Sequence, residues 1–165
     1  MSQSLSIAEW MQALNDAMSE IASTALGLSG CEIVRTSHAI PQGLEGAYLA
    51  LVGQDDSIQI GLASKAEGCQ ALAKSLLGME PGEPDIEPSD LADALSEIVN
   101  IIAGGIKSRV HGRVPPIKIG IPIFVNGTIQ PSGKQVMLVA EVIIGSVPAA
   151  LVLIEPRGVA SALAA

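Results

Sequence analysis

The chain has 165 residues, a formal net charge of −8 and only 2% aromatic residues. Its length fits one domain with a single core, and its acidic, aromatic-poor composition argues against nucleic-acid binding, which requires basic patches and stacking rings. Hydrophobic residues make up 48% of the chain, so the possibility of a membrane-spanning segment has to be tested first.

Residues 136–154, VMLVAEVIIGSVPAALVLI, form the segment that is long enough to span a bilayer. Glu141 lies in its middle, Gly145 and Ser146 signal a turn, and both halves are rich in Val and Ile. These features favour two buried strands joined by a tight turn over one spanning helix. We therefore expect no membrane association.

The cysteines and histidines do not form a metal-site pattern. Cys31 and Cys69 lie far apart in apolar segments, and neither His38 nor His111 has Cys, Asp or Glu at ligand spacing. The N-terminus has no basic region or continuous apolar stretch, so we expect no signal peptide. These observations predict a reduced, cytoplasmic protein with core cysteines and no metal site.

The first part of the chain predicts a helix followed by three strands. Ser6 and Glu9 form a capping box that opens a helix ending near Leu26. Strand patterns follow at 31–40, 46–52 and 57–63, the last two as an antiparallel hairpin. Gln12 lies three residues after Glu9, but we interpret this pair as a cap and a solvent-facing side chain, because Glu9 already has a local role.

The second part predicts two helices followed by strands. Ser64 and Glu67 form another capping box, opening a helix that Gly78 closes, and an acidic, proline-rich segment covers 79–88. A long helix follows over 89–111, capped by Ser89 or Asp90, then strands at 117–125, 135–144 and 147–155 and a short terminal helix within 156–165. The order repeats roughly the same unit twice. We predict an α+β fold in which helices cover one face of a mostly antiparallel sheet with a pseudo-two-fold repeat, as a single domain over 1–165.

The long helix has two different faces. At about 100° per residue, one stripe is apolar and consists of Leu91, Leu95, Ile98, Ile102 and Ile106. The opposite stripe consists of Asp93, Glu97, Asn100, Gly104 and Lys107. Asparagine is a poor helix former without a capping role in mid-helix. Gly104 and Gly105 each cost about 1 kcal/mol relative to alanine, which predicts close approach by a partner or a neighbouring element.

This polar stripe is the remaining candidate site. No serine nucleophile motif occurs, and no set of acid, base and nucleophile can be assembled. Residues 104–108, GGIKS, differ from a phosphate-binding loop because they lie inside a helix and lack the upstream glycine. The competing interpretation is that Asp93, Glu97 and Asn100 form the solvated side of an ordinary amphipathic helix.

The segment SEIVNIIAGG, with Asp93, Glu97, Asn100 and Gly104 and with Pro122 twenty-two residues after Asn100, resembles the signature helix of the CheC, CheX and FliY chemotaxis phosphatases. It is most similar to the CheX branch, because the motif occurs once and the chain length and element order agree. The resemblance implies one CheX-like domain with one site per subunit. It also implies a homodimer formed through the sheet.

In function, the resemblance implies a hydrolase that removes phosphate from a phosphorylated CheY-type response regulator in two-component signalling. Glu97 would pair with the regulator's active-site lysine, and Asn100 would orient the attacking water. The regulator would supply Mg²⁺, so the chain needs no cofactor of its own. Asp93, Ile101 and Gly104 would contact the partner, although Ile101 could instead pack at the edge of the core. The alternative is a non-catalytic adaptor of the same fold that binds a regulator without hydrolysis.

Overall fold

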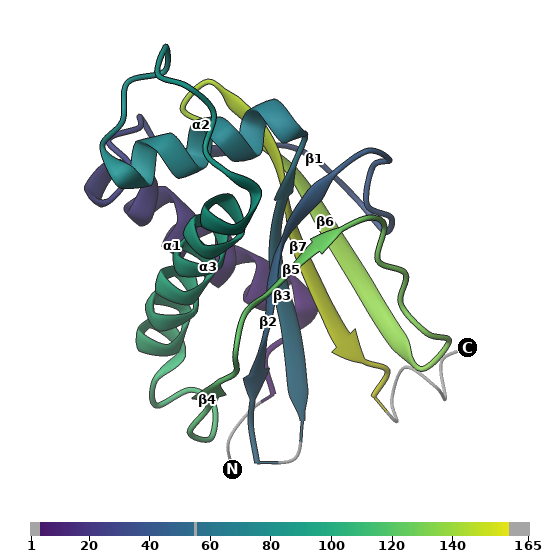
Figure 1. The fold of residues 1–165 in the computed structure, drawn as a ribbon. Coiled ribbons are helices and arrows are strands. Elements are labelled where there is room, and N and C mark those ends of the chain that lie inside the picture. Colours follow the sequence, from purple (N-terminus) through teal and green to yellow (C-terminus); the bar gives the residue numbers. More distant parts are fainter. Residues whose placement is uncertain (1–3, 55, 159–165) are drawn as a thin grey trace.

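The computed structural model describes residues 4–54 and 56–158, in which three helices pack on one face of a seven-stranded antiparallel sheet (Figure 1). The helices are α1 (Ile7–Thr24), α2 (Ala66–Leu77) and α3 (Pro88–Val110). The strands are β1 (Cys31–Ser37), β2 (Glu45–Val52), β3 (Ser57–Ser64), β4 (Lys118–Ile119), β5 (Ile123–Asn126), β6 (Gln135–Ile144) and β7 (Val147–Pro156). The predicted α+β class is confirmed.

The strand order reveals an internal pseudo-two-fold arrangement. The sheet runs β1-β6-β7-β3-β2-β4, and β5 also pairs with β2. The central pair is therefore β7 and β3. On one side β1, from the first half of the chain, pairs with β6, and on the other side β5, from the second half, pairs with β2. Each half of the chain therefore contributes one strand that pairs with a strand of the other half, in agreement with the predicted pseudo-two-fold repeat.

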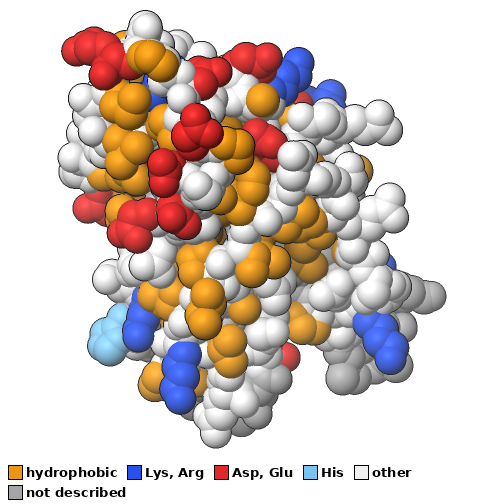
Figure 2. Space-filling view, in the orientation of Figure 1, with side chains coloured by type: hydrophobic (Ala, Val, Ile, Leu, Met, Phe, Trp, Pro, Cys, Tyr) orange, Lys and Arg blue, Asp and Glu red, His pale blue; other side chains and the backbone are white. Residues whose placement is uncertain are grey.

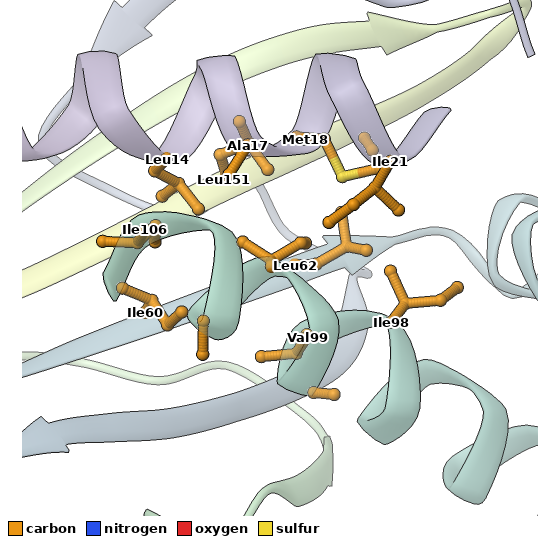
Figure 3. Packing of buried hydrophobic residues seen from close by; sticks show 14 of the residues in the cluster. Leu14, Ala17, Met18, Ile21, Ile60, Leu62, Ile98, Val99, Ile106 and Leu151 are labelled. Atoms are coloured by element: carbon orange, nitrogen blue, oxygen red, sulfur yellow. The ribbon is translucent and has the colours of Figure 1, made fainter. Parts of the chain in front are cut away.

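Helices α1 and α3 pack against each other across the sheet. Ser6 caps α1 and forms the predicted capping box with Glu9. Figure 3 shows α1 and α3 with side chains that meet above the sheet, from α1 (Leu14, Ala17, Met18, Ile21), α3 (Ile98, Val99, Ile106), β3 (Ile60, Leu62) and β7 (Leu151). The apolar stripe predicted for α3 is buried in this core, from Leu91 to Ile106.

The sheet face away from the helices carries a second, smaller core. Tyr48, Met137, Val139, Ala150, Val152 and Ile154 are buried there together with Ile40. Leu44 and Ile129, from the β1–β2 and β5–β6 connections, pack against it, and Figure 1 shows these connections on the side opposite the helices. Both sheet faces are therefore covered, which explains why the strands are so apolar.

The predicted membrane-length segment forms the β6–β7 hairpin, and its turn contains Gly145 at a φ of +62°. This positive φ is the conformation that favours glycine. Across 4–54 and 56–158, no helix combines the length and the apolar character needed to cross a bilayer. The terminal helix expected within 156–165 falls mostly on residues 159–165, which lie outside the described residues, and Pro156 belongs to β7.

Two predicted helix caps are wrong. The Ser64 hydroxyl donates to the Pro148 carbonyl at 2.7 Å, so Lys65 is the N-cap of α2 and makes no side-chain cap bond. Helix α3 begins one residue before Ser89, with Glu87 as N-cap and no side-chain cap bond. Pro88 occupies its first turn, where a residue without an N–H leaves no donor unpaired.

Candidate functional site

The predicted polar stripe of α3 lies on the solvent side of the helix. Asp93, Glu97 and Asn100 are exposed, because the residues that alternate with them at helical spacing, including Ile98 and Ile102, are fully buried. Glu97 and Asn100 are three residues apart and so project from neighbouring positions on one face. The core contacts of α3 therefore fix the direction in which this acid and amide point.

An open cavity of about 390 Å³ lies beside these side chains. Asp93, Ser96, Glu97 and Asn100 of α3 form one wall, and Gly120, Ile121 and Pro122, between β4 and β5, form the other. Pro122 is part of the predicted motif, and the fold brings it next to Asn100 although the two are far apart in sequence. The cavity is open to solvent, unlike the enclosed clefts that bury most of a small ligand.

Neither Glu97 nor Asn100 has a side-chain partner among the residues that the structure describes. No hydrogen bond there involves either side chain, and the ion pairs of that part of the chain are Arg35–Glu141, Lys74–Asp85, Arg109–Glu20 and Arg113–Glu9. A carboxylate is an acceptor and a carboxamide is both a donor and an acceptor. Both groups are therefore available to a molecule that enters the cavity.

The acidic segment before α3 is anchored to α2. The buried Lys74 ammonium donates to the Glu83 carbonyl at 2.8 Å and to the Asp85 carboxylate at 3.2 Å. The Gln70 side chain bonds both the N–H and the carbonyl of Ile86. Figure 2 shows acidic side chains gathered over this segment and the N-terminal half of α3. The local field therefore favours a cationic partner group.

Two further residues predicted to contact a partner lie outside the cavity wall. Ile101 is partly buried and packs against the large core. Gly104 is partly exposed, and a Cβ built on it would have no atom within 4 Å. Gly105 differs, because its Cβ would lie 3.1 Å from the Cβ of Ala17 in α1. Close helix packing therefore accounts for Gly105, whereas Gly104 leaves an open surface.

Neither the cysteines nor the histidines line this cavity. Cys69 is fully buried, and burial raises the pKa of its thiol to about 12. Burial raises the pKa of the Cys31 thiol to about 12 as well. In ranges 4–54 and 56–158, no group of three or more His, Cys, Asp or Glu side chains could hold a metal ion.

The sequence pattern does not predict the second wall of the cavity, although it includes Pro122 in the motif. It predicts one continuous strand over 117–125, whereas the structure has β4 and β5 separated by Gly120, Ile121 and Pro122. The signal was present, because glycine and proline inside a strand pattern are typical of a bulge. Ser96 also lines the cavity, and only its position beside Glu97 on the helix could have suggested this.

The family model for the chemotaxis phosphatase CheX matches residues 46–139, which is more than half of the chain and includes Glu97, Asn100 and Pro122. The chain belongs to the CheX family. The resemblance to chemotaxis phosphatases is thereby confirmed. No curated protein sequence matches the chain.

Solved structures share the fold of this CheX-family chain. A CheC-like superfamily protein from Shewanella sp. PV-4 superposes with a TM-score of 0.76 and 14% identity, covering 92% of this chain and 99% of the other. Chemotaxis protein CheX from Vibrio vulnificus gives 0.73 and 15%, covering 89% and 99%. A chain of the CheX–CheY–BeF3–Mg²⁺ complex from Borrelia burgdorferi gives 0.69 and 20%, covering 90% and 98%. These similarities establish the CheC/CheX-like fold.

Proposed function

We propose that this CheX-family chain dephosphorylates the aspartyl phosphate of a CheY-type response regulator, with Glu97 and Asn100 acting at the partner's active site. The observation that carries the proposal is an exposed acid and amide, three residues apart, that face an open cavity and have no side-chain partners in the part of the chain that the structure describes. A CheX-family protein has been crystallised in complex with CheY, BeF3 and Mg²⁺. That complex supports a regulator as the partner of this chain too.

The roles follow from the chemistry of the two groups. The Glu97 carboxylate accepts charge-assisted hydrogen bonds from a lysine ammonium of the regulator and so aligns the two proteins. The Asn100 amide then hydrogen-bonds a water molecule and holds it in line with the scissile bond. The water oxygen attacks phosphorus, the bond from phosphorus to the aspartyl oxygen breaks, and inorganic phosphate leaves. The free aspartate carboxylate remains on the regulator.

This mechanism requires no nucleophile from the chain, because water is the attacking group. Phosphoryl transfer depends mainly on positioning and charge neutralisation. Mg²⁺ bound by the regulator would neutralise charge on the phosphoryl oxygens, in keeping with the Mg²⁺ named in the complex from Borrelia burgdorferi. The chain's own contribution is then the alignment of water by Asn100, with α3 as the rigid support.

The test measures how fast phosphorylated receiver domains lose their phosphoryl group, with and without this protein. The receiver domains come from response regulators of the same genome and are phosphorylated with acetyl phosphate. Wild-type protein should speed the decay for at least one receiver. Asn100→Ala should abolish that acceleration without weakening binding, and Glu97→Ala should weaken binding. Gln12→Ala, which removes an exposed amide from α1, is the matched control and should leave the rate unchanged.

One result would replace the proposal with the non-catalytic alternative. If one receiver binds tightly but no receiver loses phosphate faster, the chain is an adaptor and the α3 face is a docking surface. Activity that survives in Asn100→Ala would instead show that another group orients the water.

A further inference from the structure

The segment opposite Asn100 is a β-bulge on an edge strand. Tyr48 of β2 pairs with Ile123, and Leu51 of β2 pairs with Ile119. Between these pairs, two residues of β2 face three residues of the other strand, 120–122. The extra residue cannot pair, so the strand bends outward at this point. Pro122 suits the bulge because it has no N–H to leave unpaired.

The bulge is firmly held at both ends. The Gly120 N–H donates to the Ala50 carbonyl at 2.7 Å, and a Cβ on Gly120 would lie 3.0 Å from that oxygen. On the other side, Phe124 packs against the large core. The segment is therefore a preorganised projection of the sheet edge.

This projection exposes the isoleucine side chain of Ile121, which is 88% exposed. Ile123 is 59% exposed, but it pairs with Tyr48 of the smaller core and so points to the face of the sheet away from α3. Ile121 and Pro122 also line the cavity that contains Glu97 and Asn100. Figure 2 shows hydrophobic side chains gathered between the acidic part of α3 and the edge of the sheet. The site therefore has an acidic wall on one side and an apolar wall on the other.

We infer that Ile121 is a docking contact that receives an apolar patch of the response regulator next to its phosphorylated aspartate. This inference rests on the proposed function. A single occupant has to satisfy both walls, because they border one cavity of about 390 Å³. That occupant needs a cationic group for Glu97 and Asp93 and an apolar patch for Ile121. A receiver domain that brings a lysine to Glu97 places its neighbouring surface over the bulge.

The fold supplies a matched control. The other edge strand, β1, also has a register irregularity, between Ile33 and Arg35, and Val34 at that point is 63% exposed. Val34 is thus a β-branched residue at an edge-strand irregularity on the far edge of the sheet, and it does not line the α3 cavity. If exposure of an apolar edge residue were enough for binding, Val34 and Ile121 would behave alike.

The experiment measures the dissociation constant for receiver domains from the same genome, activated with BeF3⁻ and Mg²⁺. We compare the wild type with Ile121→Ser, Ile121→Leu and Val34→Ser. Ile121→Ser should raise the dissociation constant about tenfold, as expected when one buried aliphatic contact is lost. For Ile121→Leu the dissociation constant should stay within about twofold of the wild-type value, since leucine keeps an apolar contact. For Val34→Ser it should also stay within about twofold, since Val34 lies on the other edge of the sheet. Urea unfolding checks that all variants are folded.

The phosphatase assay separates this inference from the proposed function. Ile121→Ser should raise KM and leave kcat unchanged, whereas Asn100→Ala should lower kcat and leave binding intact. An unchanged dissociation constant in Ile121→Ser overturns the inference while the phosphatase proposal stands. If the wild type dephosphorylates none of the receivers, weaker binding of Ile121→Ser to a receiver that the wild type binds supports the inference, while the phosphatase proposal is overturned. If Ile121→Ser changes the oligomeric state measured by light scattering but does not affect receiver binding, the bulge is a self-association surface and the inference is overturned.

Discussion

The polar faces of α1 and α3 have the same spacing of acid and amide, but they differ in whether these side chains bond to neighbouring residues. Ala17 of α1 and Gly105 of α3 lie in close contact where the helices meet. Glu9 and Glu97 both precede that contact by eight residues (17 − 9 and 105 − 97), and Gln12 and Asn100 both precede it by five. The pseudo-two-fold arrangement therefore places the two pairs at equivalent positions.

Local contacts occupy the α1 pair. The Glu9 carboxylate accepts from the Ser6 N–H at 2.8 Å and from Arg113 at 3.1 Å. The Gln12 amide donates to Asp16 at 2.8 Å. The equivalent groups on α3 have no such partners within ranges 4–54 and 56–158, and they face a cavity. Spacing alone therefore does not make a binding site, because the side chains also need to be free to bind.

Substitution of the two amides, Asn100 and Gln12, has the largest expected effect. We expect Asn100→Ala to lower the phosphatase rate about a hundredfold or more, because misplacing the attacking water costs about that much. Adding Gln12→Asn to that variant should not restore activity, since Glu9 remains occupied by Ser6 and Arg113. Phosphate release from a phosphorylated receiver measures both variants. Recovery in the double variant would reveal a second functional face on α1.

The contact between the helices predicts a large effect on stability. Gly105→Val should lower the free energy of unfolding by about 1 to 3 kcal/mol, because the new side chain meets Ala17 in a packed interface. Urea denaturation measures the change. Adding Ala17→Gly should recover part of the loss, since it removes the methyl group that the valine meets. Independent, additive effects would mean that the two positions do not share this contact.

The neighbouring glycine predicts a smaller effect of the opposite sign. Gly104→Ala should raise the free energy of unfolding by about 0.5 to 1 kcal/mol, because alanine favours the helix and nothing lies within 4 Å of the new methyl group. Receiver binding should weaken if the partner approaches α3 closely there. Thermal unfolding and binding are measured on the same sample. Greater stability with unchanged binding would remove Gly104 from the contact surface.

The smallest expected effect is a pH dependence at the α1 cap. Hydrogen bonds from Ser6, and then the charge of Arg113, hold the pKa of the Glu9 carboxyl below its usual value of 4.5. A lowered folded-state pKa means that this contribution to stability is present above pH 4.5 and is lost as the pH falls below it.

Glu9→Gln provides the comparison, because glutamine keeps the capping box without the charge. The difference in urea midpoint between wild type and Glu9→Gln should shrink as the pH falls from 7 to about 3. Because Glu9 is exposed, the difference should also shrink in high salt. A difference that stays constant with pH would mean that the charge of Glu9 contributes nothing to the cap.

Prediction from sequence was most accurate for elements with strong local patterns. The structure has the helices α1 and α3 that a 3.6-residue periodicity predicts and the strands that the apolar runs of the hairpins predict. These predictions hold because each element buries the face that its own pattern defines. Predictions that depended on one polar group were less reliable. Ser64 has the spacing of a capping residue, yet its hydroxyl bonds to Pro148, more than eighty residues away in sequence. Tertiary partners compete with local ones, and sequence spacing does not reveal which will prevail.

Local patterns in the sequence are enough to predict the α+β class, the helix that carries Glu97 and Asn100, and the face on which these residues lie, because periodicity and helix geometry are local properties. Long-range contacts determine which acid and amide pair has no side-chain partner in the described part of the chain, since Arg113, which follows α3, bonds to Glu9. Long-range contacts also place the bulge with Ile121 and Pro122 opposite Asn100 across a cavity. That juxtaposition depends on the pairing of β4 and β5 with β2, and long-range strand register cannot be deduced from either segment alone.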